Sequence, residues 1–222
     1  MPAKLSDKTV DELQWMGIVR FMAYRVLFGT GLRFSELRSL TIGQCHLQSN
    51  PPFVELAAKN EKNREGSEIV LQGDLARDME IYVNERLRRL TERHSAPNGT
   101  NILDTRVFEL PESFKSVFDA DLKFAGIQKR DAKGQTLDVH CTRHTYISWL
   151  AQSGVSIHAA KQLARHSDIN LTASVYTHFE REHKAAAVEQ LPDYTQLHRD
   201  FHVALNVAPD RGKACQNLTG SV

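Results

Sequence analysis

Apolar residues recur at three- and four-residue steps along most of this chain, and this helical period constrains its fold more than any other feature. Between residues 9 and 28, Trp15, Ile18, Met22 and Val26 recur at these steps. Such positions share one face of a helix, and Gly29 and Gly31 supply the turn that ends it. We therefore expect a long helix here and a mainly helical domain.

The same period predicts further helices downstream. One covers residues 74–93, with an apolar face formed by Leu75, Met79, Val83, Leu87 and Leu90. Its other face carries arginines among acidic residues, which favours solvent exposure; these are Arg86, Arg88, Arg89 and Arg93. Another helix begins after Pro111 and ends at Gly126, because proline is favoured at helix starts and glycine at helix ends.

Two short apolar runs, residues 53–56 and 69–71, interrupt the helical period. The segment between them carries Asn60, Asn63 and Gly66, which favour turns. We expect an antiparallel hairpin with a long loop. The predicted fold class is therefore mainly α with a small antiparallel β-sheet, in the α+β class.

Length and charge limit the possible functions. The chain has 222 residues, close to the usual size of one domain. Its formal net charge is +1, so any attraction to nucleic acid has to be local. Three widely spaced cysteines, Cys45, Cys141 and Cys215, fit reduced thiols better than disulfides or a zinc site. Without a signal peptide or a long apolar run, we expect a soluble cytoplasmic protein that does not enter a membrane.

One set of polar residues points to chemistry on a phosphate. Arg33 follows the first predicted helix, in the segment GTGLRFSELRSL, while His140, Arg143, His166 and Tyr176 follow one another in residues 140–178. Guanidiniums bind phosphate oxygens in a bidentate way, imidazoles donate or move protons, and a phenol can attack phosphorus. The set could break a phosphodiester without a metal.

Local signals place these residues on helices. A helix that starts at His140 puts His140 and Arg143 on one face, three residues apart. Gly154 ends that helix, and Ser156 caps a second one that stops before His166. Asp168 or Asn170 can cap a last short helix that carries Tyr176, and Ser35 can cap the short helix after Arg33. His144 is expected to pack beside the site.

The order Arg33, His140-x-x-Arg143, His166, Tyr176 resembles the tyrosine recombinase family, which includes phage integrases. The resemblance covers residues 10–191 and implies the fold of that family's catalytic domain. It also implies cleavage of DNA through a 3′-phosphotyrosyl intermediate with a free 5′-hydroxyl. The bond energy stays in the ester, so neither a nucleotide cofactor nor a metal is needed.

The resemblance implies a role for each matched residue. Tyr176 would attack the phosphate, which Arg33 and Arg143 neutralise, and Glu36 stands where the family has an acidic residue that buttresses its arginine. His166 would donate to the phosphate oxygens and His140 would assist proton transfer from the phenol.

The loop of the predicted hairpin supplies the remaining candidates. In the family a lysine on this hairpin acts as the general acid that protonates the departing 5′-oxygen. Lys59 matches that position best, and Lys62 is the alternative. All three basic residues of the loop are expected to contact DNA: Lys59, Lys62 and Arg64.

The resemblance also suggests a domain plan and partners. Residues 1–192 would form the catalytic domain and residues 193–222 a poorly ordered tail, without the N-terminal core-binding domain that family members normally carry. Double-stranded DNA is the expected partner. The predicted helix over residues 182–191 resembles one that packs into a neighbouring subunit, so we expect a homo-oligomer on DNA.

Two other functions use the same residues. Residues 147–166 have the pattern of a helix-turn-helix, which fits a DNA-binding regulator of the same fold without catalysis. A type IB topoisomerase would use the same chemistry to relax supercoils. A covalent complex with DNA separates the regulator from the two enzymes, and strand exchange between two sites separates the recombinase from the topoisomerase.

Overall fold

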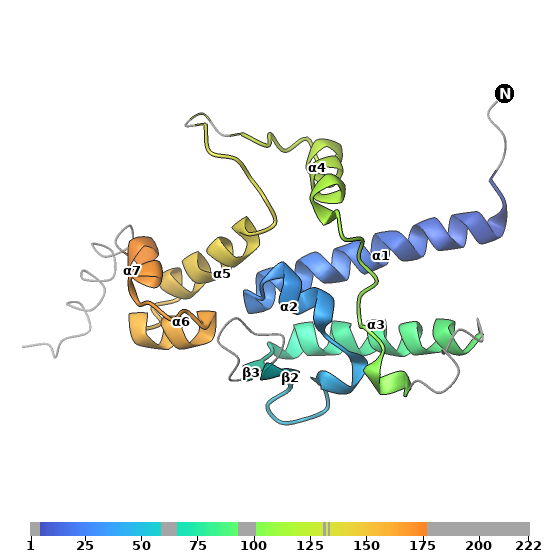
Figure 1. The fold of residues 1–222 in the computed structure, drawn as a ribbon, viewed down its shortest axis with the longest axis horizontal. Helices are drawn as coiled ribbons and strands as arrows, with labels where there is room; N and C mark the ends of the chain where they lie inside the picture. The colour runs from blue at the N-terminus through green and yellow to red at the C-terminus, as the bar shows by residue number, and fades with distance from the viewer. Residues whose placement is uncertain (1–4, 59–65, 93–100, 131, 133, 177–222) are drawn as a thin grey trace, which may run out of the picture. The chain divides into compact units, whose positions relative to one another are not determined.

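A computed structural model describes residues 5–58, 66–92, 101–130, 132 and 134–176, all within one compact unit, residues 1–179. Its helices are α1 (Asp7–Thr30), α2 (Phe34–Ser39), α3 (Gly73–Glu92), α4 (Phe114–Phe124), α5 (Cys141–Gln152), α6 (Ile157–Ala164) and α7 (Asn170–Tyr176), with 3-10 turns η1 (Ile42–Gln44) and η3 (Ile102–Asp104) (Figure 1). The strands β1 (Cys45–His46), β2 (Phe53–Leu56) and β3 (Ser67–Val70) form one antiparallel sheet in that order. The predicted fold class is confirmed.

Helix α1 is the long helix that the apolar period predicts. The Ser6 hydroxyl caps its start by accepting from the Thr9 N–H, and the Gly31 N–H closes its end on the Leu27 carbonyl. Its buried face consists of Trp15, Val19, Met22, Ala23, Val26, Leu27 and Thr30. The prediction that Ile18 lies on this buried face is wrong. Ile18 is 46 % exposed, and Val19 packs inward in its place.

The sheet matches the predicted hairpin closely. Strand β2 has the predicted bounds, and its residues Val54 and Leu56 are buried, as is Ile69 of β3. Leu71 lies beyond the end of β3 but still donates its N–H to the Pro52 carbonyl. Strand β1 was not predicted, because two residues are too few to produce an alternating pattern.

Helix α3 packs on α1 through its predicted apolar face, and Figure 1 shows the two helices running alongside each other. The solvated face was predicted correctly for Arg88 but not for Arg86, which is buried at 4 % exposure and pairs with Glu109. Arg89 is also largely covered, since its guanidinium lies over the Trp15 ring. Arg93 lies outside the described residues.

Helix α4 is joined to α1 by one polar cluster. The Asp121 carboxylate accepts hydrogen bonds from Arg20 and from the Tyr24 hydroxyl at 3.1 and 2.7 Å. The Phe114 ring stacks on Phe34 of α2. This ring contact joins α4 to the segment that carries Arg33.

Helices α5, α6 and α7 form a group beside the C-terminal end of α1 (Figure 1). Ile147 and Ala151 of α5, Ala160 and Ala164 of α6 and Thr172 of α7 are buried in it. The Ser156 hydroxyl accepts from the Ala159 N–H at 3.2 Å, so the predicted cap of α6 is confirmed. Small residues let these short helices approach closely.

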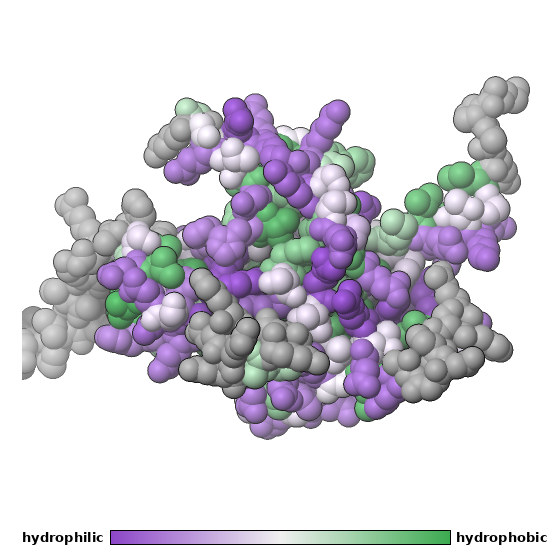
Figure 2. Space-filling view, viewed as in Figure 1, coloured by the Kyte–Doolittle hydropathy of each residue, from purple (hydrophilic) through white to green (hydrophobic). Residues whose placement is uncertain are grey.

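The surface view in Figure 2 shows a largely hydrophilic face with smaller hydrophobic patches. Within the part of the chain that the structure describes, no helix combines the length and the hydropathy that crossing a membrane requires.

Candidate active site

Arg33 begins helix α2. It occupies the N-cap position with extended backbone, and its N–H donates to Glu36 Oε2 at 2.8 Å. Its guanidinium donates to Glu36 Oε1 at 2.7 Å, so the carboxylate holds both ends of the residue. The prediction that Ser35 caps α2 is wrong, because Ser35 is the second residue of the helix and is exposed. The Glu36 carboxylate caps the helix by accepting from the Arg33 backbone N–H.

Arg143 lies on the inner face of α5 and is only 2 % exposed. Its Nη1 donates to the Gly31 carbonyl at 2.5 Å, and its Nη2 donates to the Ala164 carbonyl. One side chain thereby joins the turn after α1 to the end of α6. Burial lowers the Arg143 pKa to about 10, helped by the charges of Arg33 and Arg165, so the group is still charged at neutral pH.

Only a glycine fits at position 31, where the turn after α1 meets Arg143. Its φ of 62° lies in the left-handed region, and an added Cβ would stand 2.4 Å from Cδ1 of Tyr146. The glycine therefore lets α1 end, lets the Tyr146 ring approach, and presents its carbonyl to Arg143.

His140 is the N-cap residue of α5, one turn before Arg143. Its backbone N–H donates to Asp138 Oδ1 at 2.8 Å, and its ring meets His144 edge-on with centroids 5.0 Å apart. Partial burial lowers the His140 pKa, and the nearby charges of His144 and Arg143 lower it further. His144 was predicted to pack beside the site; its ring does contact His140, but the residue is exposed.

His166 follows α6 and faces the buried Thr172 of α7. Its Nδ1 and the Thr172 hydroxyl are 3.0 Å apart. Partial burial, followed by the charges of Arg143 and Arg33, lowers the His166 pKa to about 4. The imidazole is therefore neutral at pH 7 and can donate one N–H while accepting at the other nitrogen.

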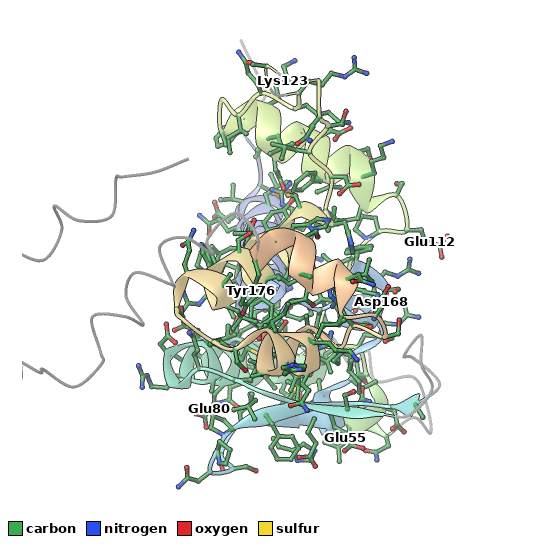
Figure 3. All side chains as sticks on the ribbon, turned by 90° about the vertical axis from the view of Figure 1, so that its left-hand side faces the viewer. Glu55, Glu80, Glu112, Lys123, Asp168 and Tyr176 are labelled. Atoms are coloured by element: carbon green, nitrogen blue, oxygen red, sulfur yellow. The ribbon has the colours of Figure 1, made fainter. Side chains whose placement is uncertain are left out.

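Tyr176 is the last residue of α7. Asp168 caps this helix by accepting from the Asn170 N–H at 2.9 Å. Figure 3 looks onto the helix and labels Asp168 and Tyr176 at its two ends. The Tyr176 hydroxyl donates to the Val155 carbonyl at 2.7 Å, on the turn between α5 and α6, and burial raises its pKa.

Arg165 is a residue of this site that the sequence patterns did not single out. It has positive φ, 52°, at the end of α6. Its Nη2 lies 2.9 Å from Glu36 Oε2, so Glu36 pairs with two arginines. The pair Arg165-His166 sits within the motif, but only the fold shows which carboxylate the arginine reaches.

The site thus gathers Arg33, His140, Arg143 and His166 from the start of α2, the start of α5 and the end of α6. Residues 8–183 match the sequence model of the phage integrase family. The chain belongs to the phage integrase family.

Relatives within this family carry the name tyrosine recombinase. The chain is 28 % identical over 185 residues to tyrosine recombinase XerD of Oceanobacillus iheyensis, covering 80 % of this chain and 58 % of that protein. It is 30 % identical over 194 residues to tyrosine recombinase XerC of Pseudomonas savastanoi pv. phaseolicola, covering 83 % and 58 %. The chain therefore spans less than two thirds of these relatives' length.

Solved structures share the fold of this integrase-family chain. XerA recombinase aligns with a TM-score of 0.55 at 21 % identity, covering 87 % of this chain and 65 % of that one. The Tn1549 transposon integrase in complex with transposon right end DNA aligns with a TM-score of 0.56 at 20 % identity, covering 85 % and 66 %. The catalytic domain of bacteriophage HP1 integrase is covered over 95 % of its length, with a TM-score of 0.50 at 21 % identity over 86 % of this chain.

Three of the predicted site residues belong to the predicted hairpin loop. Lys59, Lys62 and Arg64 fall outside the described residues. Among the residues that are described, no group of three or more His, Cys, Asp or Glu side chains is arranged to hold a metal ion. Cys45 and Cys141 are free thiols, and burial raises the pKa of both.

Proposed function

We propose that this chain is the catalytic part of a site-specific DNA recombinase or integrase, which cleaves and rejoins double-stranded DNA in the cytoplasm through a 3′-phosphotyrosyl intermediate. One observation carries the proposal: the buried Arg143, one turn after His140, donates to the carbonyls of Gly31 and Ala164, which lie two residues before Arg33 and two residues before His166. Two guanidiniums and two imidazoles from distant parts of the chain therefore share one electrostatic site, which suits a phosphate.

The arginines act on the scissile phosphate. Arg33 has 27 % of its side chain exposed, and Glu36 fixes its orientation. Arg143 keeps N–H groups beyond those bound to the Gly31 and Ala164 carbonyls, because a guanidinium carries more donors than those two bonds use. Both groups neutralise the charge that gathers on the phosphate oxygens during attack.

The histidines and the tyrosine carry out the transfer. The Tyr176 oxygen forms a bond to phosphorus, the bond from phosphorus to the 5′-oxygen breaks, and His140 takes the phenol proton. Neutral His166 donates its remaining N–H to a phosphate oxygen. Lys59 gives a proton to the departing 5′-oxygen, and the reverse reaction with another strand rejoins the DNA.

Attack requires the Tyr176 hydroxyl to leave the Val155 carbonyl. The 2.7 Å bond between them directs the phenol proton to a carbonyl that cannot accept it as a base. Binding of DNA supplies a competing acceptor, the phosphate. The proposal includes a homo-oligomer on DNA, in which the segment of residues 182–191 packs into a neighbouring subunit.

Covalent trapping tests the proposal. The substrate is a pool of duplexes in which randomised sequence surrounds one nick, so that the cleaved strand end diffuses away and the intermediate persists. The wild-type chain should form a band that survives denaturation and disappears with protease. Tyr176→Phe should bind the pool without forming the band, because only the attacking oxygen is lost.

Tyr24→Phe is the matched control. Tyr24 also donates a hydrogen bond, to Asp121 at 2.7 Å, so its substitution removes the same group from a tyrosine of α1. This variant should form the band at the wild-type rate. A persistent band with Tyr176→Phe, or none with the wild type, would contradict the proposal.

A further inference from the structure

Glu36 is a buried carboxylate that binds two arginines, one three residues away and one 129 residues away in the sequence. It is 1 % exposed. Its Oε1 accepts from the Arg33 guanidinium at 2.7 Å, while Oε2 accepts from the Arg33 backbone N–H and from Arg165 at 2.8 and 2.9 Å. Arg165 therefore contacts the carboxylate that orients Arg33.

The charge of Arg165 matters to this carboxylate. Burial by itself raises the pKa of Glu36, but Arg165 is the strongest of the opposing influences, followed by Arg33, and together they hold the pKa below its usual value. The Arg165 side chain is itself only 9 % exposed. Glu36 stays ionised in the core because two guanidiniums face it.

The backbone conformation of Arg165 is one that favours glycine, so an arginine at this position indicates a role for the side chain. Its φ and ψ of 52° and 44° are left-handed, and it is the one non-glycine residue with positive φ among those described. Glycine adopts this conformation without steric cost, whereas an arginine does not. An outlier of this kind within a site points to a functional contact.

The same turn also holds the second arginine of the site. Ala164, which precedes Arg165, accepts from Arg143 through its carbonyl. The end of α6 is therefore fastened to both phosphate-binding arginines, to Arg143 through the backbone and to Arg33 through Glu36.

We propose that Arg165 is a positioning residue for Arg33: by holding Glu36 it fixes the Arg33 guanidinium for the scissile phosphate, without contacting DNA itself. This inference rests on the proposed function. It predicts that Arg165 contributes to cleavage only while Arg33 is present.

A double-mutant cycle in single turnover, with saturating nicked duplex, tests this dependence. Arg165→Gly suits the backbone and removes the guanidinium, so it should fold and cleave at least tenfold more slowly. Arg165→Lys, which retains the charge, should recover part of the loss. In an Arg33→Ala background, Arg165→Gly should cause no further loss; multiplied losses would overturn the proposal.

Arg38→Ala is the matched control. Arg38 also lies on α2, but it pairs with Glu112, which is 91 % exposed. This variant should cleave at the wild-type rate, and its effect should not depend on Arg33. An equal loss in Arg38→Ala and Arg165→Gly would also overturn the proposal, since any lost arginine would then have the same effect.

A second cycle needs no activity. Urea unfolding of Arg165→Gly, Glu36→Gln and the double variant should give effects that are clearly less than additive, because the two single changes remove the same ion pair. Additive effects would reject the positioning contact. A wild-type chain that forms no covalent complex would instead contradict the proposed function, while this unfolding cycle would still decide the role of Arg165.

Discussion

The Tyr176 hydroxyl donates a hydrogen bond to the Val155 carbonyl at 2.7 Å, which ties the end of α7 to the turn between α5 and α6. Burial also raises the pKa of this phenol. Both effects keep Tyr176 protonated and turned toward the backbone. Under the proposed function, activation is therefore a change of hydrogen-bond partner followed by loss of the proton.

Arg143→Ala should impair both cleavage and folding. Cleavage should fall by about a hundredfold or more, as for loss of one transition-state donor. Stability should fall by about 2–3 kcal/mol, because the Gly31 and Ala164 carbonyls lose their charged donor in a buried place. Arg33→Ala should cost similar activity and less stability, because the Arg33 side chain is 27 % exposed. Single-turnover rates and urea unfolding measure the two effects, and equal stability of the two variants would contradict this account.

Gly31→Ala should destabilise the protein by about 2 kcal/mol or more, since a left-handed alanine is strained. The new Cβ would also stand 2.4 Å from the Tyr146 ring and displace the carbonyl that binds Arg143. Gly17→Ala is the control: it lies within α1 with nothing within 4 Å, so it should stabilise by about 0.5–1 kcal/mol. Thermal or urea unfolding decides, and a neutral Gly31→Ala would be the contrary result.

His166 should make stability depend on pH. Folding lowers its pKa from 6.5 to about 4, so the native state favours the neutral ring. The stabilising contribution is complete above pH 6.5 and is lost as the pH falls toward about 4. Urea unfolding between pH 4 and 8 should therefore show a flatter profile for His166→Asn than for the wild type. Identical slopes would show that the ring is not held neutral.

Lys59→Ala should slow cleavage of an ordinary duplex and not of one with a sulfur in place of the departing 5′-oxygen. A thiolate leaves without a proton, so loss of the general acid should not change the cleavage rate of the sulfur substrate. Lys62→Ala, the matched loop variant, should cleave both substrates alike. If sulfur rescues Lys62→Ala and not Lys59→Ala, the two lysines exchange roles.

Arg86→Ala should destabilise the protein by about 2 kcal/mol, because a buried side chain loses its packing and its bond to Glu109 at 2.5 Å. Arg88→Ala removes an arginine of the same helix that is 53 % exposed, and it should change stability much less. Chemical unfolding of the pair is the measurement. Comparable losses would mean that Arg86 is not held in the core.

Much of the fold and the identity of the candidate site followed from local patterns. The helical period of apolar residues located α1 and α3, and a short apolar run located β2, to within a few residues. Gly31 and Ser156 marked turns that depend only on nearby backbone. The candidate site was predicted from the resemblance that the order of Arg33, His140, Arg143, His166 and Tyr176 carries. A two-residue strand such as β1 left no pattern to detect.

Only the tertiary structure decided which charged groups are buried and what they bind. Val19 replaces Ile18 in the core because the packing of α1 on its neighbours, and not its own period, selects among adjacent positions. The buried Arg86 pairs with Glu109 from a different segment, and Arg165 reaches Glu36 across 129 positions of sequence. Sequence by itself determined which groups this protein carries; the fold decided their partners, because a buried charge is stable only beside a partner that the fold brings to it.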